Sequence, residues 1–240
     1  MSLNVSPDKE TLSRRAAEAV AALIRHAVDQ RGRCTIAMAG GSTPHRLYEI
    51  LATDIRDDIP WERVHLIWGD ERHVPLDHPK SNFRMAREAL LERVPLLPDH
   101  IYPTPITGDP AADAAAYAAT IDTLLVPDSG RLDLVLLGLG DDGHTASLFP
   151  GSPALAETTR TVVAAPAPVD PRQRITLTFP AINRARNVFF LVASADKAPA
   201  LACVFGKPGG VAECPASRVQ PAGGELVWWM DEAAAACLEL

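Results

Sequence analysis

Three short polar stretches follow apolar runs in the sequence, and each could carry out chemistry on a small molecule. In one of them, LGDDGH, Asp142 precedes His144 by two residues, with Gly143 between them. An imidazole titrates near neutral pH, so it can act as a general base on water. A neighbouring carboxylate can hold the ring in one tautomer and stabilise the imidazolium. The simpler alternative for His144, taken alone, is an ordinary surface histidine in a loop.

The same stretch contains a G-x-G-x-x-G pattern, at Gly138, Gly140 and Gly143, directly after an apolar run. A dinucleotide-binding loop needs a pyrophosphate beside these glycines and a long helix after them. Two consecutive carboxylates at positions 141–142 would repel a pyrophosphate, and the Phe-Pro-Gly run at 149–151 would end a helix early. We therefore interpret the glycines as a sharp turn at a strand end and not as a nucleotide site.

The second stretch, GGSTP, could bind a phosphate. Gly40 and Gly41 let the backbone approach a ligand closely, and Ser42 or Thr43 can cap the helix that follows. Free N–H groups at a helix N-terminus favour an anion. The stretch lacks the Lys of a Walker A loop. A plain strand-to-helix turn remains an equal alternative.

The third stretch, GDERH, places Asp70, Glu71 and Arg72 in succession. In extended chain Asp70 and Arg72 share a side, so an ion pair between them is one interpretation. A solvated charged turn is the alternative. A metal ion held by Asp70, His73 and His78 is also open, although the spacing gives it no specific support. The chain has no G-x-S-x-G serine, so water activation is simpler than covalent catalysis.

Alternating apolar and helical segments must position these stretches. We expect strands at 34–40, 64–70, 132–140, 161–168, 174–179, 187–194 and 225–230, and a short strand or loop at 101–105. We expect helices from Ser6-Pro7-Asp8 to residue 31, at 42–52, 81–94, 109–125 and 196–206, and at the Ala-rich C-terminus. Alternation on this scale predicts an α/β fold: a mostly parallel, Rossmann-like sheet with helices on both faces, in one domain spanning 1–240. Ligands bind at the carboxyl ends of such strands, where all three stretches lie.

Composition narrows the range of partners. The 240 residues carry a net charge of −7, which argues against nucleic acid but not against a small anion. Four cysteines lie far apart with no C-x-x-C spacing, so reduced thiols and a cytoplasmic location are the simplest expectation. The N-terminus does not look like a signal peptide, and no run reaches the roughly 18 apolar residues of a membrane span. A monomer and a small homo-oligomer both remain open.

Five motifs occur in an order that resembles the 6-phosphogluconolactonases, which are similar to the wider glucosamine-6-phosphate isomerase/deaminase group. They are AMAGGSTPHRLYEIL, HLIWGDERHVPLDHPKSNFRMAREALL, LDLVLLGLGDDGHTASLFPG, RITLTFPAIN and DKAPAL. The resemblance runs from about residue 10 to the last strand. It implies hydrolysis of the δ-lactone of 6-phosphogluconate, a sugar phosphate lactone of the pentose phosphate pathway, with no metal or organic cofactor.

The resemblance also implies roles for individual residues. His144 matches the general base, oriented by Asp142 or Asp70, and Asp70 and Arg72 lie beside the reacting end of the sugar. The implied phosphate-binding residues are Gly40, Gly41, Ser42, Thr43, Arg174 and Lys197. Arg172 is an alternative to Arg174, but Arg174 aligns better with the R-I-T-L-T pattern.

One departure separates the activities within this group. The deaminases that the chain resembles carry a Glu five residues after the histidine, which assists ring opening, and this chain has Phe149 there. This difference favours a lactonase over a glucosamine-6-phosphate deaminase or isomerase. A non-catalytic sugar-phosphate sensor is a further alternative, but an acid–base pair of Asp70 and His144 favours an enzyme.

Overall fold

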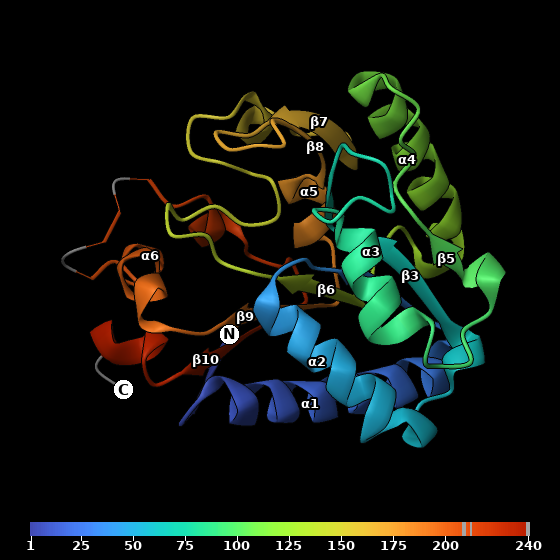
Figure 1. Cartoon of the computed structure of the whole chain (residues 1–240), viewed down its shortest axis with the longest axis horizontal. Coiled ribbons are helices and arrows are strands. Elements are labelled where there is room, and N and C mark those ends of the chain that lie inside the picture. Colours follow the sequence, from blue (N-terminus) through green and yellow to red (C-terminus); the bar gives the residue numbers. More distant parts are fainter. Residues whose placement is uncertain (208–209, 212, 239–240) are drawn as a thin grey trace.

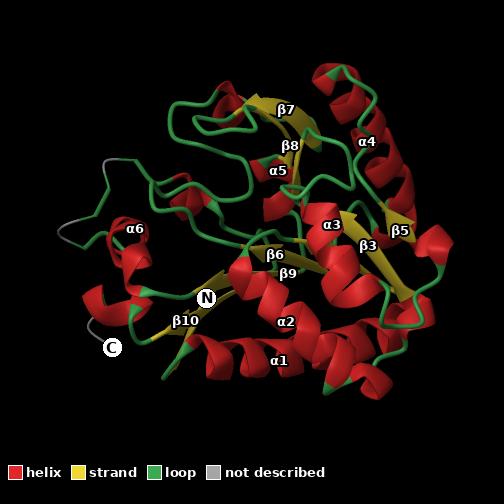
Figure 2. Cartoon of the chain, viewed as in Figure 1, coloured by secondary structure: helices red, strands yellow, loops and turns green. Residues whose placement is uncertain are grey.

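The structure, a computed structural model, describes residues 1–207, 210–211 and 213–238. Strands and helices alternate along most of the chain (Figure 2). The strands are β1 (Ser2–Ser6), β2 (Cys34–Met38), β3 (Val64–Trp68), β4 (Asp70–Arg72), β5 (Ile101–Tyr102), β6 (Leu134–Leu137), β7 (Val162–Pro166), β8 (Gln173–Leu177), β9 (Asn187–Val192) and β10 (Glu225–Asp231). The α-helices are α1 (Lys9–Arg31), α2 (Ser42–Thr53), α3 (Asn82–Ala86), α4 (Pro110–Leu124), α5 (Phe179–Asn183) and α6 (Ala198–Val204).

Seven strands form a parallel sheet in the order β1-β10-β9-β6-β2-β3-β5 (Figure 1). From β2 the chain proceeds outward to β3 and β5, whereas from β6 it proceeds the other way through β9 to β10. The direction therefore changes between β2 and β6. Such a switch point separates the loops that follow the two strands and opens a crevice at their carboxyl ends. Gly40 and Gly41 of the GGSTP stretch lie in the first loop, directly before α2, and the LGDDGH stretch lies in the second.

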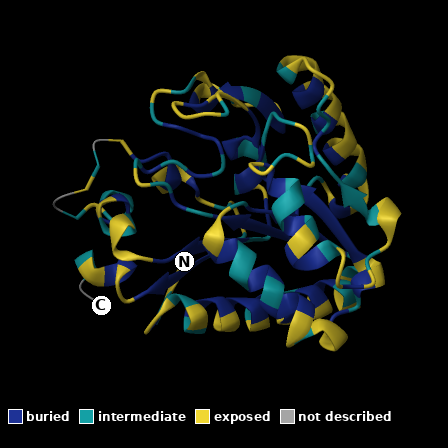
Figure 3. Cartoon of the chain, viewed as in Figure 1, coloured by how far each residue is buried: buried dark blue, intermediate teal, exposed yellow. Residues whose placement is uncertain are grey.

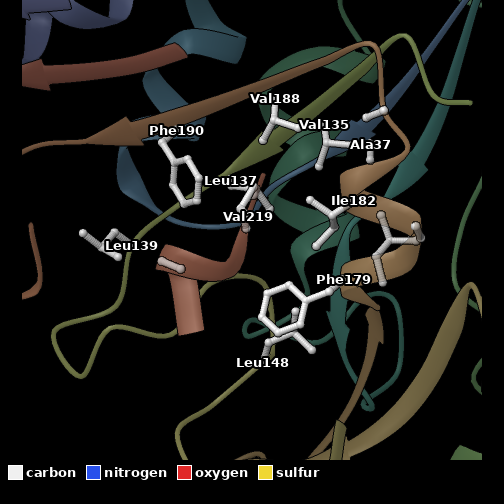
Figure 4. Packing of buried hydrophobic residues seen from close by; sticks show 14 of the residues in the cluster. Ala37, Val135, Leu137, Leu139, Leu148, Phe179, Ile182, Val188, Phe190 and Val219 are labelled. Carbon is white, nitrogen blue, oxygen red and sulfur yellow. The ribbon is translucent and has the colours of Figure 1, made fainter. Parts of the chain in front are cut away.

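Hydrophobic side chains cover both faces of this sheet, because neighbours along a strand point to opposite sides. In β6, Leu134 and Leu136 pack in one buried cluster with α1, α2 and α3, while Val135 and Leu137 pack in another with α4, α5 and α6. Figure 4 shows the second cluster, with Ile182 of α5 close to the sheet residues. The sheet is buried and the outer sides of the helices are exposed (Figure 3). The predicted α/β fold with helices on both faces is confirmed.

A second, three-stranded antiparallel sheet has the order β4-β8-β7. Strand β4 begins two residues after β3 ends, and Gly69 lies between them, donating to Met38 and accepting from Leu177. This junction carries the chain out of the parallel sheet. In the register of the small sheet, Asp70 pairs with Thr176 and Arg72 pairs with Arg174.

Some local predictions are wrong. Residues Ser2–Ser6 form β1, an edge strand beside β10, where no strand is predicted. The helix predicted at 81–94 is the short α3 followed by a π-helical turn at Arg87–Leu91. The predicted C-terminal helix is only a 3-10 turn at Ala234–Cys237 within the described residues. No helix in the described part of the chain has the length and apolar character needed to cross a bilayer.

The predicted cap of α2 is also wrong. Gly41, with φ of 103°, occupies the N-cap position instead of Ser42 or Thr43, and no side chain caps the helix. A residue with a side chain is strained at this φ. Two other helices do have hydroxyl caps: Ser81 accepts from the backbone of α3 and Thr178 from that of α5. The first N–H groups of α2 are therefore left available to a ligand.

Candidate active site at the switch point

A cleft of about 470 Å³ opens at the carboxyl ends of β2, β3, β6 and β9. Nine residues predicted from the sequence line it. Seven come from the three polar stretches, namely Gly40, Gly41, Ser42, Thr43, Asp70, Arg72 and His144, and the other two are Arg174 and Lys197. This volume is within the range of sites for small molecules. The structure thus brings together nine of the ten predicted site residues, and the tenth, Asp142, contacts His144 directly.

The LGDDGH turn holds His144 in a defined orientation. Asp142 Oδ1 lies 2.5 Å from the imidazole Nδ1 and also accepts from the His144 backbone N–H at 3.0 Å. A Cβ on Gly140 would lie 2.0 Å from Nδ1, so the ring packs directly on the glycine backbone. Gly143 has φ of 83°, and a Cβ there would lie 2.9 Å from the backbone of Cys214. Two of the three glycines in the motif therefore serve to place the imidazole.

The electrostatics of this pair suit an ionised carboxylate beside an imidazole. Partial burial acts to raise the pKa of Asp142, but the hydrogen bonds that it makes with His144 outweigh burial, so its pKa is lowered. Because Asp142 contacts Nδ1, the Nε2 atom is the one left for a ligand, and it has no hydrogen-bond partner among the described residues. This is the arrangement in which an imidazole can accept a proton at Nε2.

Phe149 lies against the other side of the imidazole. The two ring centroids are 4.3 Å apart with an interplanar angle of 37°, and Phe149 is buried. An apolar ring at this position supplies no proton donor or acceptor. The imidazole of His144 is therefore fixed by a carboxylate at one nitrogen and by aromatic packing on its face.

The GDERH stretch divides its side chains between two sides of β4. Glu71 points into the protein and accepts from the backbone N–H groups of Arg72, Asn82 and Phe83, which anchors the start of α3. Burial raises the pKa of Glu71 despite these donors. Asp70 lies on the opposite side with Arg72, toward the cleft. The prediction that alternate residues share a side is confirmed.

The predicted ion pair between Asp70 and Arg72 is wrong. Asp70 Oδ2 accepts from the Ser147 hydroxyl at 2.6 Å, and the Arg72 guanidinium donates to the Lys80 carbonyl at 2.7 Å. No ion pair joins the two side chains in the described structure. His73, one of the three candidate metal ligands, instead has its Nε2 atom 2.8 Å from Asp113 Oδ2. The described residues contain no cluster of three or more ligands suited to a metal ion.

Arg174 is a buried cation that lies opposite Arg72 on the neighbouring strand of the small sheet. Only 4% of Arg174 is exposed, and its Nε and Nη1 atoms have no hydrogen-bond partner among the described residues. Burial, followed by the charge of Arg72, lowers the pKa of the guanidinium. Arg172, the alternative, is exposed and does not line the cleft. Two adjacent guanidiniums with free donors form a site that an anion would complete.

The GGST loop lines the same cleft as Arg174 and is held by contacts on both sides of its first glycine. The hydroxyl of Tyr48 both donates to the carbonyl and accepts from the N–H of Ala39, the residue before the loop. A Cβ on Gly40 would lie 2.1 Å from Asn82 Oδ1, so only glycine leaves room for that amide. The uncapped N-terminus of α2 then presents backbone N–H groups at Ser42 and Thr43 to the cleft. These groups can bind a phosphate.

Lys197 lines the cleft, but its charge is already partly neutralised. Its ammonium pairs with Asp141 and with Asp196. Burial acts to lower its pKa, and these two carboxylates outweigh burial and raise it. Lys197 can therefore supply positive charge to the cleft, but a bound anion would have to compete with the two carboxylates for its ammonium group.

Two residues that contact Asp70, Asn82 and Ser147, were not predicted as site residues, and neither was the role of Glu71 in anchoring α3. Asn82 and Ser147 reach Asp70 from different elements, so no local pattern marks them. For Glu71 a signal was present, because alternation along β4 places it opposite Asp70 and Arg72.

Comparisons with known proteins identify the family of this chain. A family profile described as "Glucosamine-6-phosphate isomerases/6-phosphogluconolactonase" matches residues 7–228. A 6-phosphogluconolactonase of Synechocystis sp. is 45% identical over 97% of this chain and 96% of its own length, and one of Nostoc sp. is 43% identical over 99% and 98%. The structure of 6-phosphogluconolactonase from Trypanosoma brucei is 31% identical with a TM-score of 0.85, covering 99% of this chain and 98% of its own. The chain belongs to the glucosamine-6-phosphate isomerase/6-phosphogluconolactonase family.

Proposed function

We propose that this protein is a 6-phosphogluconolactonase, which hydrolyses 6-phospho-D-glucono-1,5-lactone to 6-phosphogluconate in the oxidative pentose phosphate pathway. The observation that carries the proposal is the pairing of His144 with Asp142 at the same cleft as the Arg174 guanidinium, whose Nε and Nη1 have no partner among the described residues. The cleft holds one group that can activate water and another that can bind an anion. A phosphorylated lactone needs both.

The proposed reaction begins at Nε2 of His144, which takes a proton from water while the water oxygen attacks the C1 carbonyl. Asp142 holds the opposite nitrogen and stabilises the imidazolium that forms. A positioned general base contributes about 10²- to 10⁴-fold to a rate. The C1 carbonyl becomes a tetrahedral oxyanion at this stage.

Backbone N–H groups near Gly40 are the proposed donors to that oxyanion, because they line the cleft, whereas Arg72 lies opposite Arg174 in the small sheet and belongs with the phosphate-binding groups. The C1–ring-oxygen bond then breaks as the oxyanion collapses. The imidazolium of His144 returns its proton to the departing ring oxygen, which becomes a hydroxyl group. The base is regenerated, and the product is the open-chain carboxylate.

The phosphate is the proposed binding handle. Arg174 can contact it with two N–H groups, the N-terminus of α2 can add backbone donors at Ser42 and Thr43, and Lys197 can add a point charge. Binding at this distant group fixes C1 relative to His144, which lowers the entropic part of the barrier.

The experiment that tests the function is hydrolysis of freshly prepared lactone by the purified protein, with spontaneous hydrolysis subtracted. We expect rapid turnover of the lactone and no release of ammonia from glucosamine 6-phosphate. Ammonia release would instead support a deaminase, and binding of 6-phosphogluconate without turnover would support a sensor. Phe149, which offers no proton relay at that position, is the reason for expecting no deamination.

We further propose that residues 1–240 act as one domain without a metal or organic cofactor, in the cytoplasm, as a monomer or a small homo-oligomer. The domain proposal is supported by the direct passage of β3 into β4, which joins the two sheets at the cleft. The net charge of −7 supports a small-molecule substrate over nucleic acid.

A further inference from the structure

Ser147 joins three elements that meet at the cleft. It lies three residues after His144 in the loop that follows β6, and it is 1% exposed. Its hydroxyl donates to Asp70 Oδ2 at 2.6 Å, and its backbone N–H donates to the Thr176 hydroxyl of β8 at 3.2 Å. A buried hydroxyl that donates to a carboxylate makes one of the stronger kinds of neutral-donor hydrogen bond.

The backbone before Ser147 adopts an uncommon conformation. Ala146 has φ of 49°, in the left-handed region that residues other than glycine rarely enter. Such a conformation costs free energy and persists only where surrounding contacts impose it. Here it directs the chain so that His144 and Ser147 both reach the cleft.

Asp70 is held from a second direction by Asn82. The side-chain amide of Asn82 donates to the Asp70 carbonyl at 2.9 Å and lies 3.4 Å from Oδ1. That longer contact and the cleft-lining position of Asp70 leave Oδ1 able to accept a hydrogen bond from a ligand hydroxyl. Ser147 therefore occupies Oδ2, and Oδ1 is the oxygen available to the sugar.

We propose that Ser147 is a positioning residue for the lactonase reaction, because its hydroxyl fixes the Asp70 carboxylate with Oδ1 directed at the reacting end of the sugar. This inference rests on the proposed function. Ser147 acts through Asp70 and does not itself exchange a proton with the substrate. Thr145, in the same turn and equally buried, donates instead to the Gly138 carbonyl at 2.8 Å, so its hydroxyl supports only the backbone of the turn.

The test is a double-mutant cycle on lactone hydrolysis with Ser147→Ala, Asp70→Ala and the double variant. We expect Ser147→Ala to lower kcat about tenfold, the fold-change that corresponds to one hydrogen bond to a charged group. KM should change by less than about twofold, because the phosphate-binding groups are untouched. In the Asp70→Ala background, Ser147→Ala should have no further effect. Ser147→Cys, which keeps the volume and a weak donor, should fall between Ser147→Ala and the wild type.

Thr145→Val is the matched control, because it removes a buried hydroxyl from the same turn without touching Asp70. Its effect should add to that of Asp70→Ala. Additive effects of Ser147→Ala and Asp70→Ala on kcat would overturn the positioning role, even if urea unfolding showed that the two residues are coupled in stability. In that case the hydrogen bond would be structural only.

Failure of the proposed function gives a different result. If the wild type hydrolysed no lactone but bound 6-phosphogluconate, the same cycle would be measured as its dissociation constant by calorimetry. Coupling there would support the Ser147 proposal in a sugar-phosphate sensor, and additivity would overturn it. A wild-type protein that neither hydrolysed the lactone nor bound the product would overturn both proposals.

Discussion

Replacing Arg174 with Met should weaken phosphate binding and stabilise the free protein at the same time. The guanidinium is buried, faces the like charge of Arg72, and has two nitrogens without a partner among the described residues. In the free protein the charge is therefore desolvated without full compensation, and its pKa is lowered mainly by burial. With a phosphate bound, the same nitrogens gain two charge-assisted hydrogen bonds.

The magnitude follows from those two hydrogen bonds. At about 1.5–3 kcal/mol each, they account for roughly 3–6 kcal/mol of binding free energy. Their loss corresponds to a decrease in affinity of about 10²- to 10⁴-fold. Replacing a poorly compensated buried charge by an apolar side chain of similar volume often stabilises a protein by about 1–4 kcal/mol, so Arg174→Met should raise the free energy of unfolding by about 1 kcal/mol or more.

The assay has two parts: calorimetric titration with 6-phosphogluconate and urea unfolding of the free protein. Arg172→Met is the matched control, because Arg172 is exposed and does not line the cleft. It should change both quantities little. An Arg174→Met protein that bound the product as tightly as the wild type, or lost no more affinity than Arg172→Met, would refute the assignment of Arg174 to the phosphate. A clear loss of stability would refute the argument about uncompensated burial.

Two further predictions concern the LGDDGH turn. Gly140→Ala should lower kcat at least about tenfold, because its Cβ would lie 2.0 Å from Nδ1 of His144. Gly138→Ala is the control and should change kcat little, because nothing lies within 4 Å of its Cβ. Similar kcat values for the two variants would contradict the packing argument. Asp142 has a lowered folded-state pKa, so its stabilising effect is present at neutral pH and is lost as pH falls from the ordinary value of 3.8 through the folded-state pKa. The unfolding free energy of Asp142→Asn should therefore fall less than that of the wild type in this acidic window, and parallel curves from urea unfolding at each pH would contradict the prediction.

The sequence predicts the parallel sheet well, because its central strands are apolar on both faces and end at polar glycine-containing turns. The run at 132–140 is an example, and it contains β6 (Leu134–Leu137). Strand β1 (Ser2–Ser6) was not predictable in the same way. It is a short edge strand, and its pairing with β10 depends on contacts with the other end of the chain. Long-range pairing outweighs local propensity at such positions.

The candidate site was predictable where its contacts are local. Asp142 and His144 are two residues apart, and the structure places them in contact as expected. The contact of Ser147 with Asp70 joins residues that are far apart in sequence and depends on how the loops after β3 and β6 converge. The expected pairing of Asp70 with Arg72 fails because each side chain has another partner: the Ser147 hydroxyl for Asp70 and the Lys80 carbonyl for Arg72.

The most direct test of the central claim is the rate of lactone hydrolysis by His144→Ala, with spontaneous hydrolysis subtracted. His26→Ala, which removes an exposed histidine from α1, is the control and should retain the wild-type rate. If Nε2 of His144 activates water, kcat should fall about 100-fold or more while the dissociation constant for 6-phosphogluconate changes little. A His144→Ala protein that kept more than about a tenth of the wild-type rate would contradict a general-base role for this residue.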